Sequence, residues 1–165
     1  GSPRKGRVPF FNNTPENIHK QIDGINKHLN FDFERTNDKY DHFDAIDISN
    51  NARLECKHRT CHATTYPDTL IGKNKYDYWK KYYPDCEFYV TFLFQDGLYY
   101  FKFDKEKTIQ EQHLFTTRNN KDKVYNKHAN FDKEHINIPV HLLRPLGNSP
   151  EIIAPIRRGV CCISI

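Results

Sequence analysis

Apolar residues recur at helical spacing near the start of the chain. Positions three or four residues apart share one face of a helix, and four aliphatic residues follow this spacing. Thr14 is a favourable N-cap, and Pro15 suits the first helical position. The pattern therefore predicts an amphipathic helix that begins after residue 14. Its apolar positions are Ile18, Ile22, Ile25 and Leu29.

Runs of apolar, aromatic and β-branched residues predict strands between residues 31 and 103. The run at 87–94 is almost continuously apolar, which is typical of a central strand covered on both faces. Polar turn residues at 49–51 and 95–97 separate neighbouring runs and predict two hairpins. We expect an α+β or mixed α/β fold, with a mixed sheet of about five strands flanked by helices. The predicted strands are 31–35, 42–48, 53–57, 87–94 and 98–103.

A second helix is predicted over residues 69–83, with Asp68 as its N-cap and Pro84 just past its end. At about 100° per residue, Ile71, Tyr78 and Tyr82 form one apolar stripe. Lys75 falls in the middle of that stripe. Its ammonium group either extends to the edge of the helix or reaches a polar site beneath it.

The segment 53–57 places charged and apolar residues on opposite sides of a strand. Arg53, Glu55 and Lys57 share one face, whereas Leu54 and Cys56 share the other and can face a core. Pairing with the strand at 42–48 could bring Asp44 or Asp47 close to Glu55 and Lys57, but the register stays open. An edge hairpin with solvated charges is the simpler alternative.

Two carboxylates and a lysine that converge at strand ends suit metal-assisted hydrolysis of a phosphodiester. Carboxylate oxygens bind Mg²⁺, which keeps several waters and takes further ligands from a substrate phosphate. The ion lowers the pKa of a bound water, and a lysine can orient that water or offset developing charge. On the first helix, Glu16 and Asp23 project away from the apolar face, so only Gln21 could approach such a site.

These residues resemble the PD-(D/E)xK nuclease superfamily over residues 14–104. The matching pattern is Asp44, then Glu55-x-Lys57 on the next strand, then a helix with an inward lysine, Lys75. Phe43 stands where the usual motif has proline, and this departure leaves Asp47 as a rival for the first ligand. The resemblance implies a restriction endonuclease-like core of a helix, a β-meander and a second helix.

The resemblance also implies roles for individual residues. Asp44 and Glu55, with the backbone carbonyl of Cys56, would bind one or two Mg²⁺ or Mn²⁺ ions. Lys57 would act beside the attacking water, and Lys75 would support the site or hold a phosphate. We therefore expect a metal-dependent endonuclease that acts on DNA. The alternative is a non-catalytic nucleic-acid-binding module on a nuclease-like fold.

Further residues near this segment are candidates for substrate contacts or for a different metal. The candidate substrate-binding residues are His58, Arg59 and Lys73, although the first two could equally be solvated loop residues. Cys56, Cys61 and the histidines at 58 and 62 could instead form a zinc site. Their spacing is not a recognised zinc-finger pattern, and Cys56 faces away from Glu55 and Lys57.

The chain of 165 residues is most simply one domain. We divide it into a basic arm at 1–13, whose first two residues resemble an expression scar, a core at 14–104 and an extension at 105–165. A lysine-rich region at 118–128 is either a nucleic-acid contact or a solvated loop. The net charge of +4 permits a polyanionic partner without requiring one.

Cysteine usage and hydropathy give the expected location. Five cysteines, an odd number without regular spacing, favour a reducing compartment, and so an intracellular protein of the cytoplasm or nucleus, including one of viral or phage origin. No stretch has the roughly twenty apolar residues that span a bilayer, so we expect no membrane partner. The apolar end at 160–165 is expected to dock on the domain or on a second subunit, which makes a homodimer one candidate assembly.

Overall fold

The first helix lies where the apolar periodicity predicts it. The computed structural model of the chain describes residues 13–36, 42–119 and 133–153. Helix α1 (Pro15–Leu29) begins after Thr14, whose side chain accepts a hydrogen bond from the Asn17 amide at 3.2 Å. It ends at Asn30, which adopts the left-handed conformation common at helix ends. The predicted apolar face is confirmed, because its three isoleucines are buried.

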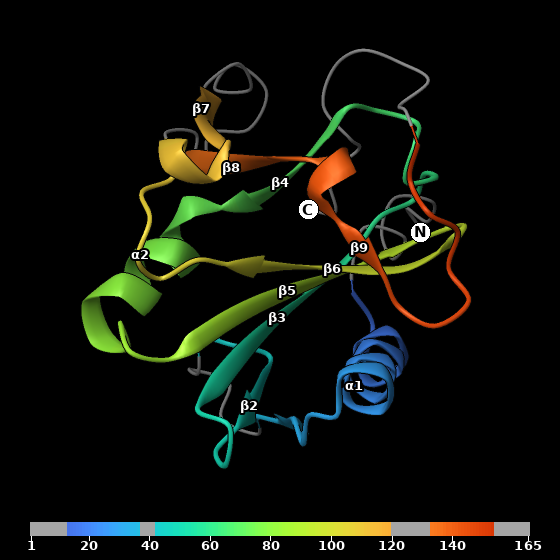
Figure 1. Cartoon of the computed structure of the whole chain (residues 1–165), viewed down its shortest axis with the longest axis horizontal. Coiled ribbons are helices and arrows are strands. Elements are labelled where there is room, and N and C mark those ends of the chain that lie inside the picture. The colour runs from blue at the N-terminus through green and yellow to red at the C-terminus, as the bar shows by residue number, and fades with distance from the viewer. Residues whose placement is uncertain (1–12, 37–41, 120–132, 154–165) are drawn as a thin grey trace, which may run out of the picture.

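A six-stranded mixed sheet forms the centre of the molecule (Figure 1). The strand order is β1-β2-β3-β5-β6-β9, and only the neighbours β3 and β5 run parallel. The α+β class is therefore confirmed. The strands of this sheet are β1 (Glu34–Arg35), β2 (Ala45–Asp47), β3 (Ala52–His58), β5 (Glu87–Phe94), β6 (Gly97–Phe103) and β9 (Arg144–Pro145).

A second, three-stranded antiparallel sheet has the order β4-β8-β7. Helix α2 (Lys73–Tyr82) directly follows the first of these strands, and Figure 1 shows this sheet and α2 lying apart from α1. Two short 3₁₀ helices, Gln110–Gln112 and Val140–Leu142, complete the described elements. The strands of the second sheet are β4 (Asp68–Gly72), β7 (Phe115–Asn119) and β8 (Lys133–Pro139).

The predicted start of the second helix is wrong. Residues 68–72 form β4, because they pair with a strand far along the chain, with Thr69 opposite Ile138 and Ile71 opposite Ile136. The helix begins only at Lys73, and its N-cap is Gly72 rather than Asp68. Ile71 thus enters the core from a strand. Local pattern could not reveal this, since the pairing partner lies more than sixty residues away.

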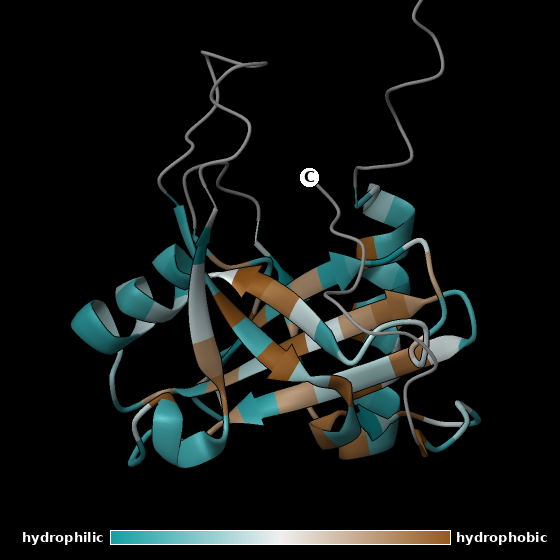
Figure 2. Cartoon of the chain, turned by 90° about the horizontal axis from the view of Figure 1, so that it is seen from above, coloured by the Kyte–Doolittle hydropathy of each residue, from teal (hydrophilic) through white to brown (hydrophobic). Residues whose placement is uncertain are grey.

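Two hydrophobic cores lie on opposite faces of the central sheet. Ile22 and Ile25 of α1 pack with Leu54 of β3 on one face. On the other face, Trp79 of α2 packs with residues of β5 and with Ile136 of β8. Figure 2 shows hydrophobic residues along the strands and hydrophilic residues on the outer faces of the helices. The central sheet is therefore covered on both sides, as the continuous apolar run at 87–94 predicts.

The region beyond residue 104 contributes to the same fold. Ile136, Ile138 and Val140 are buried in the core under α2, so this extension completes that core. Most of the predicted basic arm, most of the lysine-rich region at 118–128 and the apolar end at 160–165 lie outside the described residues. Within the described ranges, no helix combines the length and the apolarity needed to cross a membrane.

Candidate functional site

Strand β3 presents charged side chains to one face of the sheet and apolar side chains to the other. Leu54 and Cys56 are buried against α1, as predicted. Glu55 and Lys57 alternate with them and therefore point toward α2. Pairing with the parallel strand β5 sets Glu55 opposite Val90, in the interior of the sheet. The strand thus holds a carboxylate at the edge of a hydrophobic core.

Glu55 is the most unusual ionisable residue of this face. It is only 4% exposed, and its Oε2 lies 3.2 Å from Lys57 Nζ. Its Oε1 lies 3.9 Å from Lys75 Nζ and has no hydrogen-bond partner among the described residues. Burial raises the pKa of Glu55, the Asp44 charge raises it further, and the charges of the two lysines only partly offset both effects.

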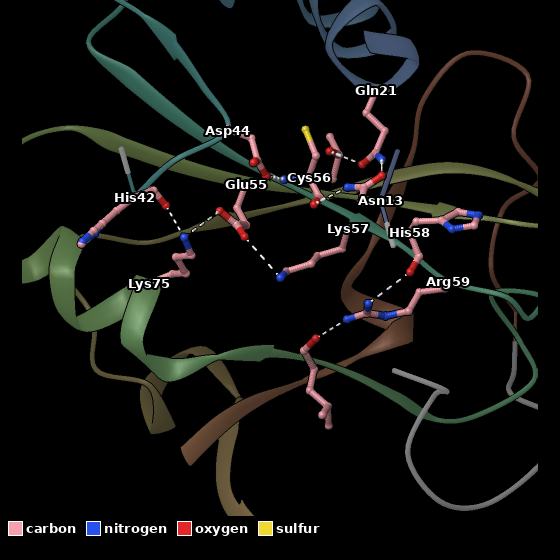
Figure 3. A network of polar contacts seen from close by, with 12 residues as sticks. Asn13, Gln21, His42, Asp44, Glu55, Cys56, Lys57, His58, Arg59 and Lys75 are labelled. Carbon is pink, nitrogen blue, oxygen red and sulfur yellow. Dashed lines mark hydrogen bonds and ion pairs between the residues drawn. The ribbon is translucent and has the colours of Figure 1, made fainter. Parts of the chain in front are cut away.

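Asp44 joins this group from the segment that precedes β2 (Figure 3). Its Oδ2 accepts a hydrogen bond from the Cys56 amide at 2.8 Å, and its own amide donates to the Leu54 carbonyl at 2.9 Å. These two bonds fix Asp44 beside the middle of β3. Its charge is one of the causes that raise the pKa of Glu55, in agreement with this placement.

Asp47, the rival ligand, has a structural role instead. Its carboxylate accepts hydrogen bonds from the Asp32 amide, the Ser49 hydroxyl and both the backbone and side-chain amides of Asn50, at 2.7–3.0 Å. Burial raises the pKa of Asp47, but these hydrogen bonds outweigh burial and leave the pKa lowered. Its oxygens therefore stabilise the turn between β2 and β3, and Asp44 is the better candidate for a ligand.

Lys75 reaches the polar site beneath its helix. Its Nζ donates a hydrogen bond of 2.5 Å to the His42 carbonyl and approaches Glu55 (Figure 3). Of the two alternatives for this lysine, the structure therefore favours the inward one. Lys57 and Lys75 flank the same carboxylate from a strand and from a helix, although they are 18 positions apart in the sequence.

A chain of hydrogen bonds connects α1 to the Cys56 carbonyl, the proposed third metal ligand. The Asn13 side-chain amide donates to this carbonyl at 2.7 Å, and the Gln21 amide donates to Asn13 Oδ1 at 3.3 Å. The Thr91 hydroxyl in turn donates to Gln21 Oε1 at 2.7 Å. Gln21 thus approaches the site as predicted, whereas Asn13 and Thr91 were missed. The available signal for Thr91 was its position as a polar residue in the middle of the otherwise apolar and aromatic segment 88–94.

Of the three predicted substrate contacts, the structure contradicts Arg59, whereas His58 and Lys73 stay predictions. Arg59 is 1% exposed, and its guanidinium donates to the Thr69 hydroxyl and to the Leu70 and His58 carbonyls, so it joins β3 to β4 rather than facing solvent. His58 follows Lys57 on β3 and lies on the opposite face (Figure 3). Burial, with the nearby Arg59 charge, lowers the pKa of His58 and favours its neutral form. Lys73 is partly exposed and forms an ion pair with Asp77 at 3.0 Å.

The donor set suits Mg²⁺ or Mn²⁺ better than zinc. Asp44, Glu55 and the Cys56 carbonyl supply oxygen atoms, and Mg²⁺ takes the rest of its coordination from water and phosphate. Oε1 of the buried Glu55 accepts no hydrogen bond among the described residues, so it has a lone pair that could bind such an ion. Over the described ranges, no three side chains of histidine, cysteine, aspartate or glutamate gather closely enough to hold a metal. The Cys56 thiol, which would be the first ligand of the zinc alternative, is buried against α1.

No family model, no curated protein and no solved structure matches the chain.

Proposed function

We propose that this protein is a metal-dependent endonuclease that hydrolyses phosphodiester bonds in DNA. The observation that carries the proposal is the buried carboxylate of Glu55, which has one oxygen without a hydrogen bond among the described residues and lies beside Asp44 and two lysines. A buried carboxylate with a raised pKa costs stability unless a cation offsets its charge. A divalent ion bound by Glu55 and Asp44 would supply that positive charge and could take part in phosphodiester hydrolysis.

The residues of the site divide the proposed reaction among them. Hydrolysis joins a water oxygen to phosphorus and breaks the bond from phosphorus to one ester oxygen. Lys57 orients the water and offsets the negative charge that grows on the phosphate. Lys75, held by the His42 carbonyl, contributes a second positive charge at a fixed place. A divalent ion held by Asp44, Glu55 and the Cys56 carbonyl would polarise the phosphoryl oxygen and make the attacking water more acidic.

The charge of the site favours one ion over two. Asp44 and Glu55 are the two carboxylates of the proposed site, and both lysines already lie within 4 Å of Glu55. A second divalent ion would lie beside two ammonium groups at short range, where like charges repel strongly. We therefore propose a stoichiometry of one Mg²⁺ or Mn²⁺ per chain.

One observation favours the non-catalytic alternative. Lys57 and Lys75 can neutralise Glu55 without a metal, because they approach its two oxygens at 3.2 and 3.9 Å. Such a chain would bind nucleic acid on a nuclease-like fold and cut nothing. The alternative predicts equal nucleic-acid binding with and without a divalent ion. Cleavage assays, together with nucleic-acid binding measured with and without the divalent ion, therefore separate this alternative from the nuclease.

The test compares the same substitution, aspartate to asparagine, at two positions. Asp44→Asn keeps an acceptor for the Cys56 amide but removes the charge, so we expect Mg²⁺-dependent cleavage of DNA to fall at least about a hundredfold. Asp47→Asn weakens only the turn, so cleavage per folded molecule stays near wild type. The substrates are supercoiled, linear and branched DNA and RNA, each with Mg²⁺, Mn²⁺ or EDTA. Equal cleavage by Asp44→Asn and wild type would refute the proposed ligand.

An intracellular location remains part of the proposal. Cys56 and Cys86 are buried and form no disulfide bond, which suits a reducing compartment. A homodimer likewise stays a proposal, and size-exclusion chromatography with light scattering tests it directly.

A further inference from the structure

A cluster of aromatic rings continues outward from the candidate site. We call it the tyrosine patch, and it consists of His42, Phe43, Tyr78, Tyr82 and Tyr83. The His42 ring stacks on Tyr78 with 3.7 Å between centroids, and Tyr78 contacts Tyr82 at 4.7 Å and Tyr83 at 6.0 Å. The patch begins at the site itself, because the His42 carbonyl accepts the hydrogen bond from Lys75.

The outer part of the tyrosine patch is exposed rather than buried in the core. Tyr76 and Trp79 form the buried face of α2, whereas Tyr82 is 55% exposed and Tyr83 is 38% exposed. Exposed large apolar side chains are normal when they are scattered singly. Here two of them are adjacent in the chain and share ring contacts with Tyr78, so they form a surface rather than isolated exceptions.

Positive charges accompany the exposed rings. The Arg53 guanidinium lies 4.7 Å from the Tyr83 ring centroid, and Lys81 Nζ lies 5.1 Å from that of Tyr82. Helix α2 carries four lysines and one acidic residue, Asp77, which pairs with Lys73. The Arg53 and Lys81 cations each lie over one face of a ring, so the patch combines exposed aromatic rings with positive charge. This combination matches the bases and phosphates of an unpaired nucleic-acid strand.

We propose that the tyrosine patch stacks the bases of a single strand next to the scissile phosphate. The inference rests on the proposed function for the position of that phosphate, and it deepens it by naming unpaired nucleic acid as the preferred substrate region. Bases in a duplex are already stacked on one another, so exposed rings gain little from them. Unpaired bases have free faces, and Arg53 and Lys81 neutralise the flanking phosphates.

The experiment measures binding without cleavage. Fluorescence anisotropy in EDTA gives the Kd of the full chain for a short labelled single strand and for a hairpin duplex of the same length. Tyr82→Ala/Tyr83→Ala is expected to raise the Kd for the single strand at least about fivefold, since each stacked base contributes roughly 1–3 kcal/mol. The Kd for the duplex stays near its wild-type value.

Two control variants separate stacking from other causes. Tyr82→Phe/Tyr83→Phe keeps both rings and is expected to bind the single strand like wild type. Phe115→Ala removes a ring that is 43% exposed on the second sheet and is expected to change neither Kd. Thermal unfolding checks that each variant folds. If the double alanine variant does not fold, Tyr82→Ala alone, at the more exposed position, carries the comparison.

Three results would overturn the inference: an unchanged single-strand Kd in the alanine variant, an equal loss for the duplex, or an equal loss in the phenylalanine variant. The binding result can nevertheless be read separately from the cleavage result. If no metal supports cleavage but the alanine variant loses single-strand binding, the nuclease fails and the patch stands. If Asp44→Asn abolishes cleavage but the alanine variant binds normally, the patch fails and the nuclease stands.

Discussion

Glu55 shows how a single residue can work against the stability of the fold that holds it. Its carboxylate is buried beside Asp44, and its pKa is raised above the ordinary value. Such a group favours its protonated form in the folded chain. Folding stability therefore falls as the pH rises from the ordinary pKa range of glutamate toward the raised folded value, and it stays lower above that value.

The substitution Glu55→Gln removes the buried charge while it keeps the size of the side chain. The amide cannot ionise, so the variant should be more stable than wild type at neutral pH by about 1 kcal/mol, or roughly 2–4 °C in Tm. Below the ordinary glutamate range the two proteins should unfold at similar temperatures. Lys57 and Lys75 remain partly exposed and can be solvated when their partner is lost.

Thermal unfolding followed across pH, with and without Mg²⁺, measures both effects. Mg²⁺ at ten times its Kd should stabilise the wild type by about 1.4 kcal/mol and leave Glu55→Gln unchanged. A variant that is less stable than wild type at neutral pH would show that the two lysines already stabilise the carboxylate fully.

At the scale of elements, local pattern predicted some parts of the fold and missed others. Helix α1 and strands β3 and β5 were predicted because their signals are contained in a few neighbouring residues. Strand β4 was missed because its partner β8 lies far along the chain. Arg59 was misassigned for the same reason, since its acceptors on β4 become neighbours only after the second sheet forms.

The candidate site could likewise be predicted only where its signals are local in the sequence. Strand alternation alone predicted that Glu55 and Lys57 share a face, whereas the hairpin left Asp44 and Asp47 as alternatives and only the family resemblance favoured Asp44. The contact between Lys75 and Glu55 and the hydrogen bond from Asn13 depend on how helices lie on the sheet. Sequence fixes neither the angle nor the register of such packing.

The buried side chain of Arg59 connects the two sheets. Arg59→Ala leaves the buried Leu70 carbonyl without its donor and opens a cavity beside Phe92, so we expect a loss of about 2–4 kcal/mol in unfolding free energy. Arg118→Ala is the matched control. Its exposed ion pair with Glu134, at 3.5 Å, contributes less than about 1 kcal/mol.

Urea unfolding followed by circular dichroism compares the two arginine variants. Equal midpoints for Arg59→Ala and Arg118→Ala would mean that the buried guanidinium does not hold β3 against β4. A large loss confined to Arg59→Ala would show that the second sheet depends on this side chain.

At the scale of the whole molecule, two cores share one sheet. Ile22 lies in the core under α1, and Trp79 lies in the core under α2. Leu54 and Glu55 are neighbours on β3 and face opposite cores, so loss of either core exposes one face of the same strand. The two cores are therefore expected to unfold as one cooperative unit.

The corresponding prediction uses the only tryptophan as a reporter. Ile22→Ala removes apolar volume on the far face of the sheet and should cost about 2–5 kcal/mol. Trp79 fluorescence should nevertheless report the whole shift in urea midpoint, in step with circular dichroism. Ile48→Ala, at a position 88% exposed, should leave the midpoint unchanged. A Trp79 transition that ignores Ile22→Ala would mean that the two cores unfold separately.

The alternation along β3 also bears on how such a chain could change over generations. The side chains that dock α1 and the side chains that would do chemistry alternate along this strand and point to opposite faces of the sheet. During evolution, substitution of Glu55 or Lys57 could therefore remove the proposed cleavage activity while the fold is retained for nucleic-acid binding. The same one or two substitutions could be engineered to convert the proposed nuclease into a stable nucleic-acid-binding reagent.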